Sequence, residues 1–271
     1  REQIGLEKAG ILRAGRPAVF SGRDMPTTIA ARAAELGTDL RVAGKDYAVS
    51  RREASWDLQQ AGTPRRALPF PAMRGARQLD NAAGVLIALD FLAERLPLDQ
   101  RAIRSGLLAA QLPGRFDVRP GQPTWVLDVA HNTQAAEVLN DLLGDFFVPG
   151  RRIAVFGALD DKDVAGITRI LRGRFDAWYL VDLSSQARGL SADALSAQVS
   201  AQLGDVPSVR GGSIEATLAQ AVTASAPDDV IVVFGSFLTV SAAMTWLSDP
   251  QQDHPDGERR IIPASADDPS E

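Results

Sequence analysis

The strongest constraint on the fold is a regular alternation of apolar runs and helix-type segments between residues 119 and 247. Short apolar runs lie at residues 124–129, 152–156, 177–181 and 230–234, with a weaker run at 206–209. Apolar residues recur at helical spacing in residues 133–143, 163–171, 192–203, 214–224 and 238–247. Strands that are apolar throughout are typical of a parallel sheet with helices on both faces. The alternation therefore predicts a doubly wound, mostly parallel α/β sheet.

The first 117 residues mix short strands and helices without that regularity. The patterns predict helices at residues 4–11, 26–36, 80–95 and 99–110, and strands at 18–20, 47–49 and 67–70. Leu112-Pro113-Gly114 breaks the pattern and is the best candidate boundary in this stretch. We expect one domain over residues 1–117 and a second over 118–247. In residues 248–271, Pro, Asp and Ser dominate without periodicity, which predicts a disordered acidic tail.

Composition excludes several classes of protein. The 271 residues are 45% apolar and 23% charged, as in globular proteins with a real core, and unlike collagen-like or disordered chains. The net charge of −5 lies wholly in residues 248–271, so nothing favours nucleic acid or acidic lipid as a partner. The absence of cysteine excludes disulfides and thiolate metal sites and fits a reducing cytosol.

One uncharged stretch, residues 230–248, approaches the length that spans a bilayer. Gly235-Ser236 interrupts it early, and hydroxyl residues dilute the remainder. We therefore interpret it as a strand, a turn and a helix, and expect a cytoplasmic protein with no membrane partner.

Candidate site residues follow three of the predicted strands, where ligands bind in open parallel sheets. The strands lead into Asp128-Val129-Ala130-His131-Asn132, into Gly157 with Asp160-Asp161-Lys162-Asp163, and into Gly235-Ser236. One edge of the sheet would thus present a carboxylate, an imidazole, an ammonium group and a helix amino-terminus. Backbone N–H groups at such a terminus can bind a carboxylate or phosphate.

Each of these groups also has a purely structural interpretation. Asp128 could be a turn residue, Asn132 or Thr133 a helix N-cap, and Asp163 the cap of the next helix. Gly235-Ser236 could be only a tight turn. His131 fits a structural and a functional role equally well.

Lysine usage adds a further candidate. Only three of the 29 basic residues are lysines, namely Lys8, Lys45 and Lys162. In a chain that otherwise uses arginine, a lysine can mark a position where a primary amine is needed. Unlike arginine, a lysine amine can react with carbon dioxide to give a carbamate, and so become a metal ligand. Gly44-Lys45 does not fit a phosphate-binding P-loop, and no dinucleotide-binding glycine fingerprint follows the first strand of the sheet. A conventional zinc site is also disfavoured, because there is no cysteine and only one histidine outside the tail.

Five motifs, taken in order, resemble the folylpolyglutamate synthase/dihydrofolate synthase family of the Mur ligase superfamily. They are Glu7-Lys8-Ala9-Gly10-Ile11, Leu112-Pro113-Gly114-Arg115-Phe116, Asp128-Val129-Ala130-His131-Asn132, Asp161-Lys162-Asp163 and Gly235-Ser236-Phe237. Each motif is weak alone, but five in order at family-like spacing are specific. The resemblance covers nearly everything from residue 1 to about residue 247.

The resemblance implies a carboxyl-terminal Rossmann-like domain preceded by the end of a central Mur ligase ATPase domain, without the P-loop part. It implies an ATP-dependent amide ligase that joins L-glutamate to a folate or dihydropteroate carboxylate through an acyl phosphate. The cofactors it implies are ATP and Mg²⁺, which neutralises the phosphates, with a monovalent cation as a further candidate. We expect small-molecule substrates, a monomer, and no ATP turnover by this chain alone.

The resemblance also assigns residues to the nucleotide and the metal. Lys8, as a carbamate, would help to hold a second Mg²⁺ and is a catalytic candidate. Asn81 would contact the adenine side of ATP, although the family's usual His-Gln is Arg77-Gln78 here. Arg115 would reach the phosphates across the domain cleft. Asp128 would accept hydrogen bonds from the ribose hydroxyls.

The remaining assignments concern the incoming glutamate. His131, the second catalytic candidate, and Ser236 would place it, with Lys162 and Arg188 as further candidates. The family's usual proline after His-Asn is Thr133 here, which a helix cap can replace. Whether the substrate is dihydropteroate, folate or both stays open.

Three alternatives compete with this interpretation. A Mur ligase of peptidoglycan precursors would share the superfamily motifs. A non-catalytic nucleotide-binding remnant would account for the missing P-loop. A dehydrogenase comes last, because the glycine fingerprint is absent.

Overall fold

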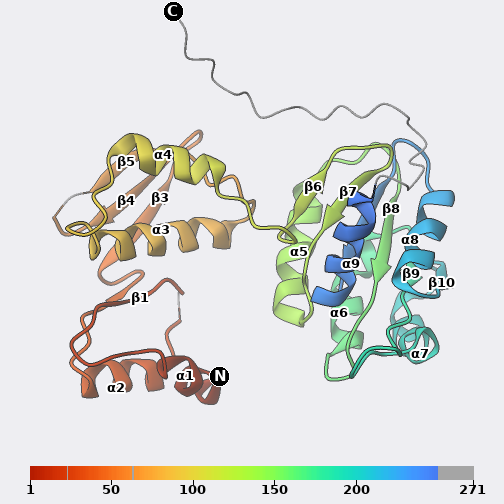
Figure 1. The fold of residues 1–271 in the computed structure, drawn as a ribbon, viewed down its shortest axis with the longest axis horizontal. Coiled ribbons are helices and arrows are strands. Elements are labelled where there is room, and N and C mark those ends of the chain that lie inside the picture. Colours follow the sequence, from red (N-terminus) through yellow and green to blue (C-terminus); the bar gives the residue numbers. More distant parts are fainter. Residues whose placement is uncertain (23, 63, 250–271) are drawn as a thin grey trace, which may run out of the picture. The chain divides into compact units, whose positions relative to one another are not determined.

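The computed structural model describes residues 1–22, 24–62 and 64–249. The chain divides into two compact units, Arg1–Leu112 and a second beginning at Pro113 (Figure 1). The division falls within Leu112-Pro113-Gly114. Residues 113–117, which the sequence pattern grouped with the first domain, belong to the second unit. Ser248 still lies in a helix, and the rest of the predicted tail, from residue 250 on, lies outside the described residues.

The second unit contains a six-stranded sheet in the order β10-β9-β8-β11-β7-β6. Its strands are β6 (Asp117–Arg119), β7 (Thr124–Leu127), β8 (Arg152–Phe156), β9 (Ala177–Leu180), β10 (Ser208–Arg210) and β11 (Val230–Phe234). All neighbouring strands run parallel except β6, which is antiparallel to β7. The predicted mostly parallel α/β sheet is confirmed. Strand β6 was missed, because a three-residue edge strand with charged ends gives almost no signal.

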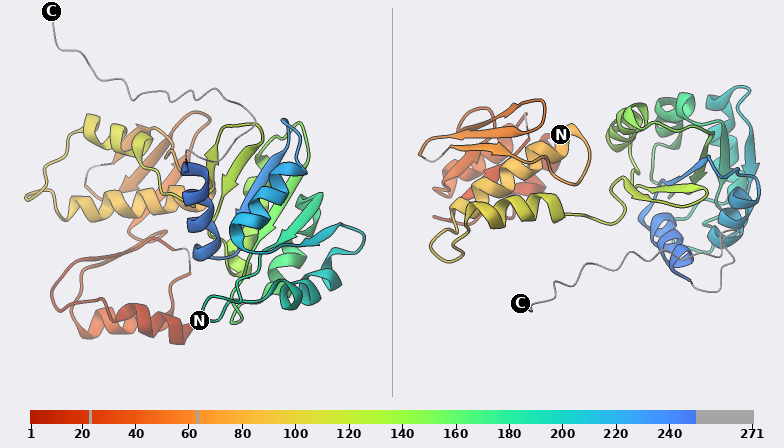
Figure 2. Two further views of the ribbon diagram at one scale, coloured as in Figure 1. Left: turned by 45° about the vertical axis from the view of Figure 1, so that its right-hand side comes forward. Right: turned by 90° about the horizontal axis from the view of Figure 1, so that it is seen from above.

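Helices cover both faces of this sheet. They are α5 (Thr133–Asp145), α6 (Val164–Leu171), the 3₁₀ turn η1 (Arg172–Arg174), α7 (Ala192–Leu203), α8 (Ile214–Thr223) and α9 (Phe237–Ser248). Helices α5, α6 and α7 pack on one face, and α8 and α9 on the other. The right-hand view of Figure 2 shows α5 in green and α9 in blue on opposite sides of the sheet.

Alternation along β11 explains its continuous apolar sequence. Val232 and Phe234 pack with α5, α6 and α7, whereas Ile231 and Val233 pack with α8 and α9. Both faces are buried, so each position of the strand is apolar. Among the described residues, no helix is both long and apolar enough to cross a membrane.

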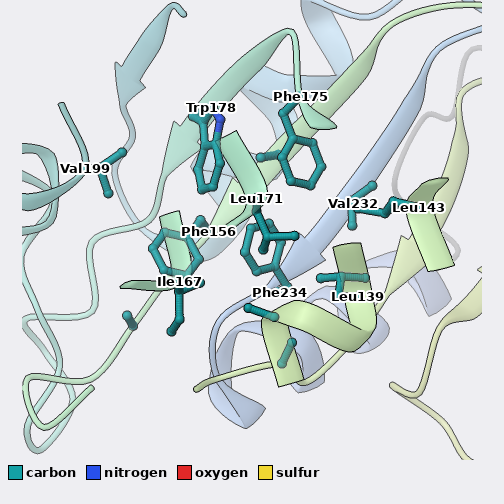
Figure 3. Packing of buried hydrophobic residues seen from close by; sticks show 14 of the residues in the cluster. Leu139, Leu143, Phe156, Ile167, Leu171, Phe175, Trp178, Val199, Val232 and Phe234 are labelled. Atoms are coloured by element: carbon teal, nitrogen blue, oxygen red, sulfur yellow. The ribbon is translucent and has the colours of Figure 1, made fainter. Parts of the chain in front are cut away.

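An aromatic cluster fills the face covered by α5, α6 and α7 (Figure 3). Phe175 stacks on Phe234 with ring centroids 5.5 Å apart, and Trp178 meets Phe156 edge to face at 5.7 Å. Such pairs contribute about 1 kcal/mol each beyond their buried area. The cluster joins β8, β9 and β11 and so fixes the strands that carry the candidate site.

Polar side chains begin the helices that follow the strands. Asn132, Asp163, Ser191, Ser213 and Ser236 each accept a hydrogen bond from the backbone N–H three residues onward. Each cap contributes about 1 kcal/mol. The cap interpretation of Asn132 and Asp163 is thereby confirmed.

The first unit contains two small sheets and four helices. Strands β1 (Ala18–Phe20) and β2 (Leu40–Val42) form a parallel pair, and β3 (Tyr47–Arg51), β4 (Trp56–Gln60) and β5 (Arg65–Leu68) form an antiparallel sheet. The helices are α1 (Glu2–Ala9), α2 (Thr27–Glu35), α3 (Ala76–Asp90) and α4 (Gln100–Ala109). Trp56, Leu58 and Leu68 are fully buried against α3 and α4.

The predictions for this unit misplaced one helix and missed two strands, β2 and β4. The helix predicted at residues 80–95 begins at Ala76 and ends at Asp90, and Leu92 and Leu96 beyond it are exposed. Strand β4 was missed because it contains a buried acid. The Asp57 carboxylate accepts hydrogen bonds from the Arg52 side chain and the Ala67 N–H, which makes its burial tolerable.

Candidate active site

The candidate site lies at the carboxyl edge of the six-stranded sheet. Strand β11 pairs with β8 on one side and with β7 on the other, so the three polar strand ends adjoin one another, as predicted. Helices α5 and α6, after β7 and β8, leave to one face, and α9, after β11, leaves to the other. In parallel sheets, this divergence of connections opens the crevice in which ligands bind.

Asp128 follows β7 and is held by the backbone. Its Oδ2 accepts from the Phe116 N–H at 2.8 Å, and its Oδ1 accepts from the Ala130 N–H at 2.8 Å. The residue is only 9% exposed. Burial raises the pKa of Asp128, although both hydrogen bonds and the positive charge of Arg115 act to lower that pKa. The carboxylate therefore already has two protein donors.

Arg115 lies in a turn whose shape is fixed on both sides. Gly114 has φ +72° and Phe116 has φ +48°. A Cβ on Gly114 would lie 3.1 Å from the Val129 side chain, so this position is closely packed. Phe116 is buried and meets Phe146 edge to face, with ring centroids 5.6 Å apart. Arg115 is exposed between these two buried residues, so the turn presents its guanidinium to solvent.

His131 is oriented by two contacts. Its Nδ1 lies 2.8 Å from the Val129 carbonyl oxygen. A carbonyl only accepts, so we assign the hydrogen to Nδ1, and Nε2 remains to face a ligand. The imidazole also lies against Phe237, with ring centroids 5.7 Å apart and planes tilted by 45°. The structure thus brings His131 beside the amino-terminus of α9.

The amino-terminus of α9 follows a turn that requires glycine. Gly235 has φ +107°, and a Cβ there would lie 2.5 Å from the Gly157 carbonyl oxygen. Ser236 is 4% exposed, and its Oγ accepts from the Thr239 N–H at 3.0 Å and lies 2.7 Å from Thr239 Oγ1. Its hydroxyl is therefore used as the helix cap. What this turn offers a ligand is the positive end of the helix and the 60% exposed ring of Phe237.

Lys162 and Arg188 meet at one carboxylate. Lys162 Nζ lies 2.8 Å, and Arg188 Nη1 3.5 Å, from Asp161 Oδ2. The Asp160 N–H donates to the Arg188 carbonyl, which joins the loops that follow β8 and β9. The hydrogen bond from Lys162 is the main reason why the pKa of Asp161 lies below its usual range. Asp160 and Asp163 flank this pair in the same loop, so the two cations are balanced by neighbouring carboxylates.

Lys8 and Asn81 belong to the first unit. Lys8 is exposed in the last turn of α1, with its Nζ 3.2 Å from Glu7 Oε1. Asn81 is exposed on α3, and its Nδ2 donates to Gln78 Oε1 at 3.3 Å. Within residues 1–22, 24–62 and 64–249, no three histidine or acidic side chains gather in a way that could hold a metal ion. Lys8 and Glu7 alone do not make a metal site.

The first unit also contains a pocket of about 460 Å³ that none of the predicted site residues lines. Several of its polar groups are engaged, whereas the buried Arg65 Nε has no hydrogen-bond partner among the described residues. Arg65 Nη2 lies 2.5 Å from Asp90, Gln60 donates to Asp90 at 2.7 Å, and Arg41 stacks over the Phe91 ring. These contacts show that part of the polar lining serves the packing of the unit.

Asp161 and Phe237 belong to motifs quoted from the sequence, but neither residue was given a role of its own there. Asp161 collects the two cations, and Phe237 contacts His131. A usable signal existed for Phe237. It is a large apolar residue in the first turn of a helix, directly after the N-cap that follows a strand. At that position few core residues are available for it to pack against.

Comparisons with known proteins match this arrangement. Residues 114–237 match the family described as Mur ligase, glutamate ligase domain. The chain is 38% identical over 248 residues to the Escherichia coli K12 dihydrofolate synthase/folylpolyglutamate synthase, covering 90% of this chain and 55% of that protein. The chain therefore spans about half the length of the curated relatives it matches.

Two solved structures are similar over the same range. Escherichia coli FolC in complex with DHPP and ADP aligns with a TM-score of 0.80 and 34% identity, over 91% of this chain and 56% of that chain. A bifunctional folylpolyglutamate synthase/dihydrofolate synthase with Mn, AMPPNP and L-glutamate bound aligns with a TM-score of 0.78 and 39% identity, over 91% and 57%.

Proposed function

This chain belongs to the folylpolyglutamate synthase/dihydrofolate synthase family of the Mur ligase superfamily, and on that premise we propose that it is part of an ATP-dependent amide ligase that adds L-glutamate to a folate or dihydropteroate carboxylate. The observation that carries the proposal is the gathering of Arg115, Asp128, His131 and the α9 amino-terminus at one sheet edge. The nucleotides and L-glutamate named in the relatives' complexes support it.

The proposed reaction has two steps. The γ-phosphoryl group of ATP passes to the acceptor carboxylate, giving an acyl phosphate and ADP. The glutamate amino group then attacks the acyl carbon, phosphate leaves, and the amine loses a proton as the amide forms. The protein must hold a polyphosphate, an amino acid with two carboxylates, and the acceptor.

Arg115 is the residue we propose for the ATP phosphates. A guanidinium is permanently charged and presents donors in a rigid fork that matches phosphate oxygens. Gly114 and Phe116 fix the backbone on either side, so the turn loses little freedom when the side chain binds. In the first unit, we propose that Asn81 contacts the adenine.

We propose that His131 and the α9 amino-terminus hold the incoming glutamate. His131 Nε2 accepts in the assigned tautomer and can bind the glutamate amino group, and the first-turn N–H groups of α9 can bind a carboxylate. Ser236 contributes by capping that helix, because its Oγ is already bonded to Thr239. Lys162 and Arg188 are further candidates for a carboxylate, since both cations lie at Asp161 in the loops that follow β8 and β9.

A divalent metal is also part of the proposal. A related structure contains Mn, and we propose that the ion is Mg²⁺, with carbamylated Lys8 as one ligand. The described residues supply no complete ligand set, so we derive no step of the reaction through the metal. When bound, such an ion would neutralise phosphate charge. We also propose a cytoplasmic, monomeric protein.

The first test is nucleotide binding, measured by calorimetry with AMPPNP. We expect binding that weakens at least tenfold in Arg115→Gln. Arg119→Gln is the matched control, because Arg119 lies in the same segment but pairs with Asp117. If neither variant loses affinity for AMPPNP, the phosphate assignment is contradicted.

A second measurement tests the choice of acceptor substrate. Saturating UDP-sugar should not compete with folate for binding, and competition would favour the peptidoglycan alternative.

A second candidate is nucleotide binding without turnover. The absence of a P-loop in the 271 residues favours it for this chain taken by itself. AMPPNP binding with no ATP hydrolysis would be its signature.

A further inference from the structure

The Asp128 carboxylate lies between two segments that each present one of the proposed substrate contacts. The turn at residues 114–116 presents Arg115, and the strand end at residues 128–131 presents His131. We infer that Asp128 is a positioning residue that holds these two segments together as one hydrogen-bonded unit. The functional meaning of the inference rests on the roles proposed above for Arg115 and His131.

The first link is the carboxylate itself. One oxygen accepts from Phe116 in the turn, and the other accepts from Ala130 at the strand end, each at 2.8 Å. Phe116 has φ +48°, an unfavourable conformation for a residue with a side chain, and its N–H donates to Asp128 in that conformation. The position of the Arg115 backbone therefore depends on this carboxylate.

The second link runs through the Val129 backbone. Its N–H donates to the Gly114 carbonyl at 2.9 Å, and its carbonyl accepts from His131 Nδ1 at 2.8 Å. A displacement of the 114–116 turn thus reaches the imidazole through a single residue. Close packing of Gly114 against Val129 adds a steric coupling to the hydrogen bonds.

The positioning role needs no contact between Asp128 and the nucleotide ribose. Asp128 is 9% exposed and both of its oxygens already have donors. A ribose hydroxyl would have to approach the small accessible part of a carboxylate that is engaged on both sides. Positioning explains why an acid is buried here, because a carboxylate accepts at two separate oxygens and so reaches both N–H groups.

The test replaces Asp128 by Asn in the whole chain, without nucleotide. Asn keeps the size but offers one acceptor oxygen, and its NH₂ group faces the other N–H, so one of the two links is broken. The readout is the imidazole C–H signal of His131 in a two-dimensional NMR spectrum. The chain has only two histidines, so His254→Gln assigns both signals.

Asp182→Asn is the matched control. Asp182 also follows a strand of the same sheet and accepts from two backbone N–H groups, those of Ser184 and Ala192. We expect Asp128→Asn to shift the His131 signal by more than its line width, and Asp182→Asn to leave it in place. The tryptophan indole N–H signals should stay unchanged in both variants.

An unchanged His131 signal in folded Asp128→Asn would overturn the inference. If AMPPNP affinity fell at the same time, Asp128 would affect nucleotide binding without positioning His131. If Asp128→Asn does not fold, hydrogen exchange of the unaltered chain decides. The N–H groups of Phe116, Val129 and Ala130 should then exchange together, and free exchange of Phe116 beside a protected Ala130 would overturn the inference. Neither measurement needs ATP or folate. Failure of the positioning inference can therefore be distinguished from failure of the proposed ligase function.

Discussion

Asp229 offers the sharpest test of how the candidate site is supported. It precedes β11, is 2% exposed, and joins the start of that strand to the start of β8. Its carboxylate accepts from the Ala226 N–H at 2.9 Å and from the Arg151 N–H at 2.7 Å. It also accepts from Arg151 Nε at 3.1 Å and Nη2 at 2.7 Å. The perturbation is Asp229→Ala.

The expected loss follows from these bonds. Each backbone N–H loses a charged acceptor, which costs about 1–1.5 kcal/mol. The Arg151 side chain is 52% exposed and still donates to the Ala224 carbonyl, so its pair contributes about 0.5 kcal/mol. The free energy of unfolding should therefore fall by about 3 kcal/mol.

The loss should also depend on pH. Burial works to raise the pKa of Asp229, but the four hydrogen bonds prevail and the net pKa lies below the ordinary 3.8. A lowered folded-state pKa gives stability that is complete above the unfolded value and disappears as the pH falls through the folded one. The difference between the wild type and Asp229→Ala should be full at pH 7 and shrink below about pH 4.

The assay is urea unfolding followed by tryptophan fluorescence. Trp125, Trp178 and Trp246 lie in the second unit and report on its sheet. Asp228→Ala is the control, because it removes the same charge from an exposed neighbouring position and should change stability by less than about 0.5 kcal/mol. Equal effects of the two substitutions, or a difference that does not shrink as the pH falls below about 4, would refute the reasoning.

Three further predictions concern the site and the isolated chain. Gly235→Ala should lower the free energy of unfolding in urea by about 3 kcal/mol, because Gly235 has φ +107° and a Cβ there would clash with the Gly157 carbonyl oxygen. The control Gly204→Ala, at φ +61° with open space around it, should cost about 1 kcal/mol, and equal costs would contradict the packing argument. Arg188→Gly should raise the free energy of unfolding by up to about 1 kcal/mol by relieving its φ of +62°, and should weaken L-glutamate binding in calorimetry; a loss of stability would show that the strain is absent. The purified chain should show no folate-dependent ATP hydrolysis, since it contains no P-loop, and measurable phosphate release in a coupled assay would sink that expectation.

Much of the second unit was predictable because its core leaves a strong local signal. Strand β8 and strand β11 are uninterrupted apolar runs, and both faces of each are covered by helices. Elements without that signal were missed. Strand β6 has one apolar residue, and β4 buries Asp57, whose partner Ala67 lies on another strand. Such partners become visible only when the chain is folded.

The same division applies to the candidate site. The residue types at the strand ends predicted which edge carries polar groups, and strand pairing confirmed that edge. Which atoms are already engaged was not predictable. Ser236 uses its hydroxyl on Thr239, and Asp128 uses both oxygens on the backbone. Short-range patterns identify a group near a ligand site, but tertiary hydrogen bonds decide whether that group is available.

The position of β11 in the middle of the sheet has a consequence for how the unit folds. Strands β7 and β8 each pair with β11 and not with each other, although β11 is the last strand to be made. Until it arrives, the sheet consists of two separate halves, β6 with β7 and β8 with β9 and β10. Pairings between segments so distant in sequence form slowly. During synthesis, the crevice that would bind substrate therefore assembles only when β11 inserts between the two halves.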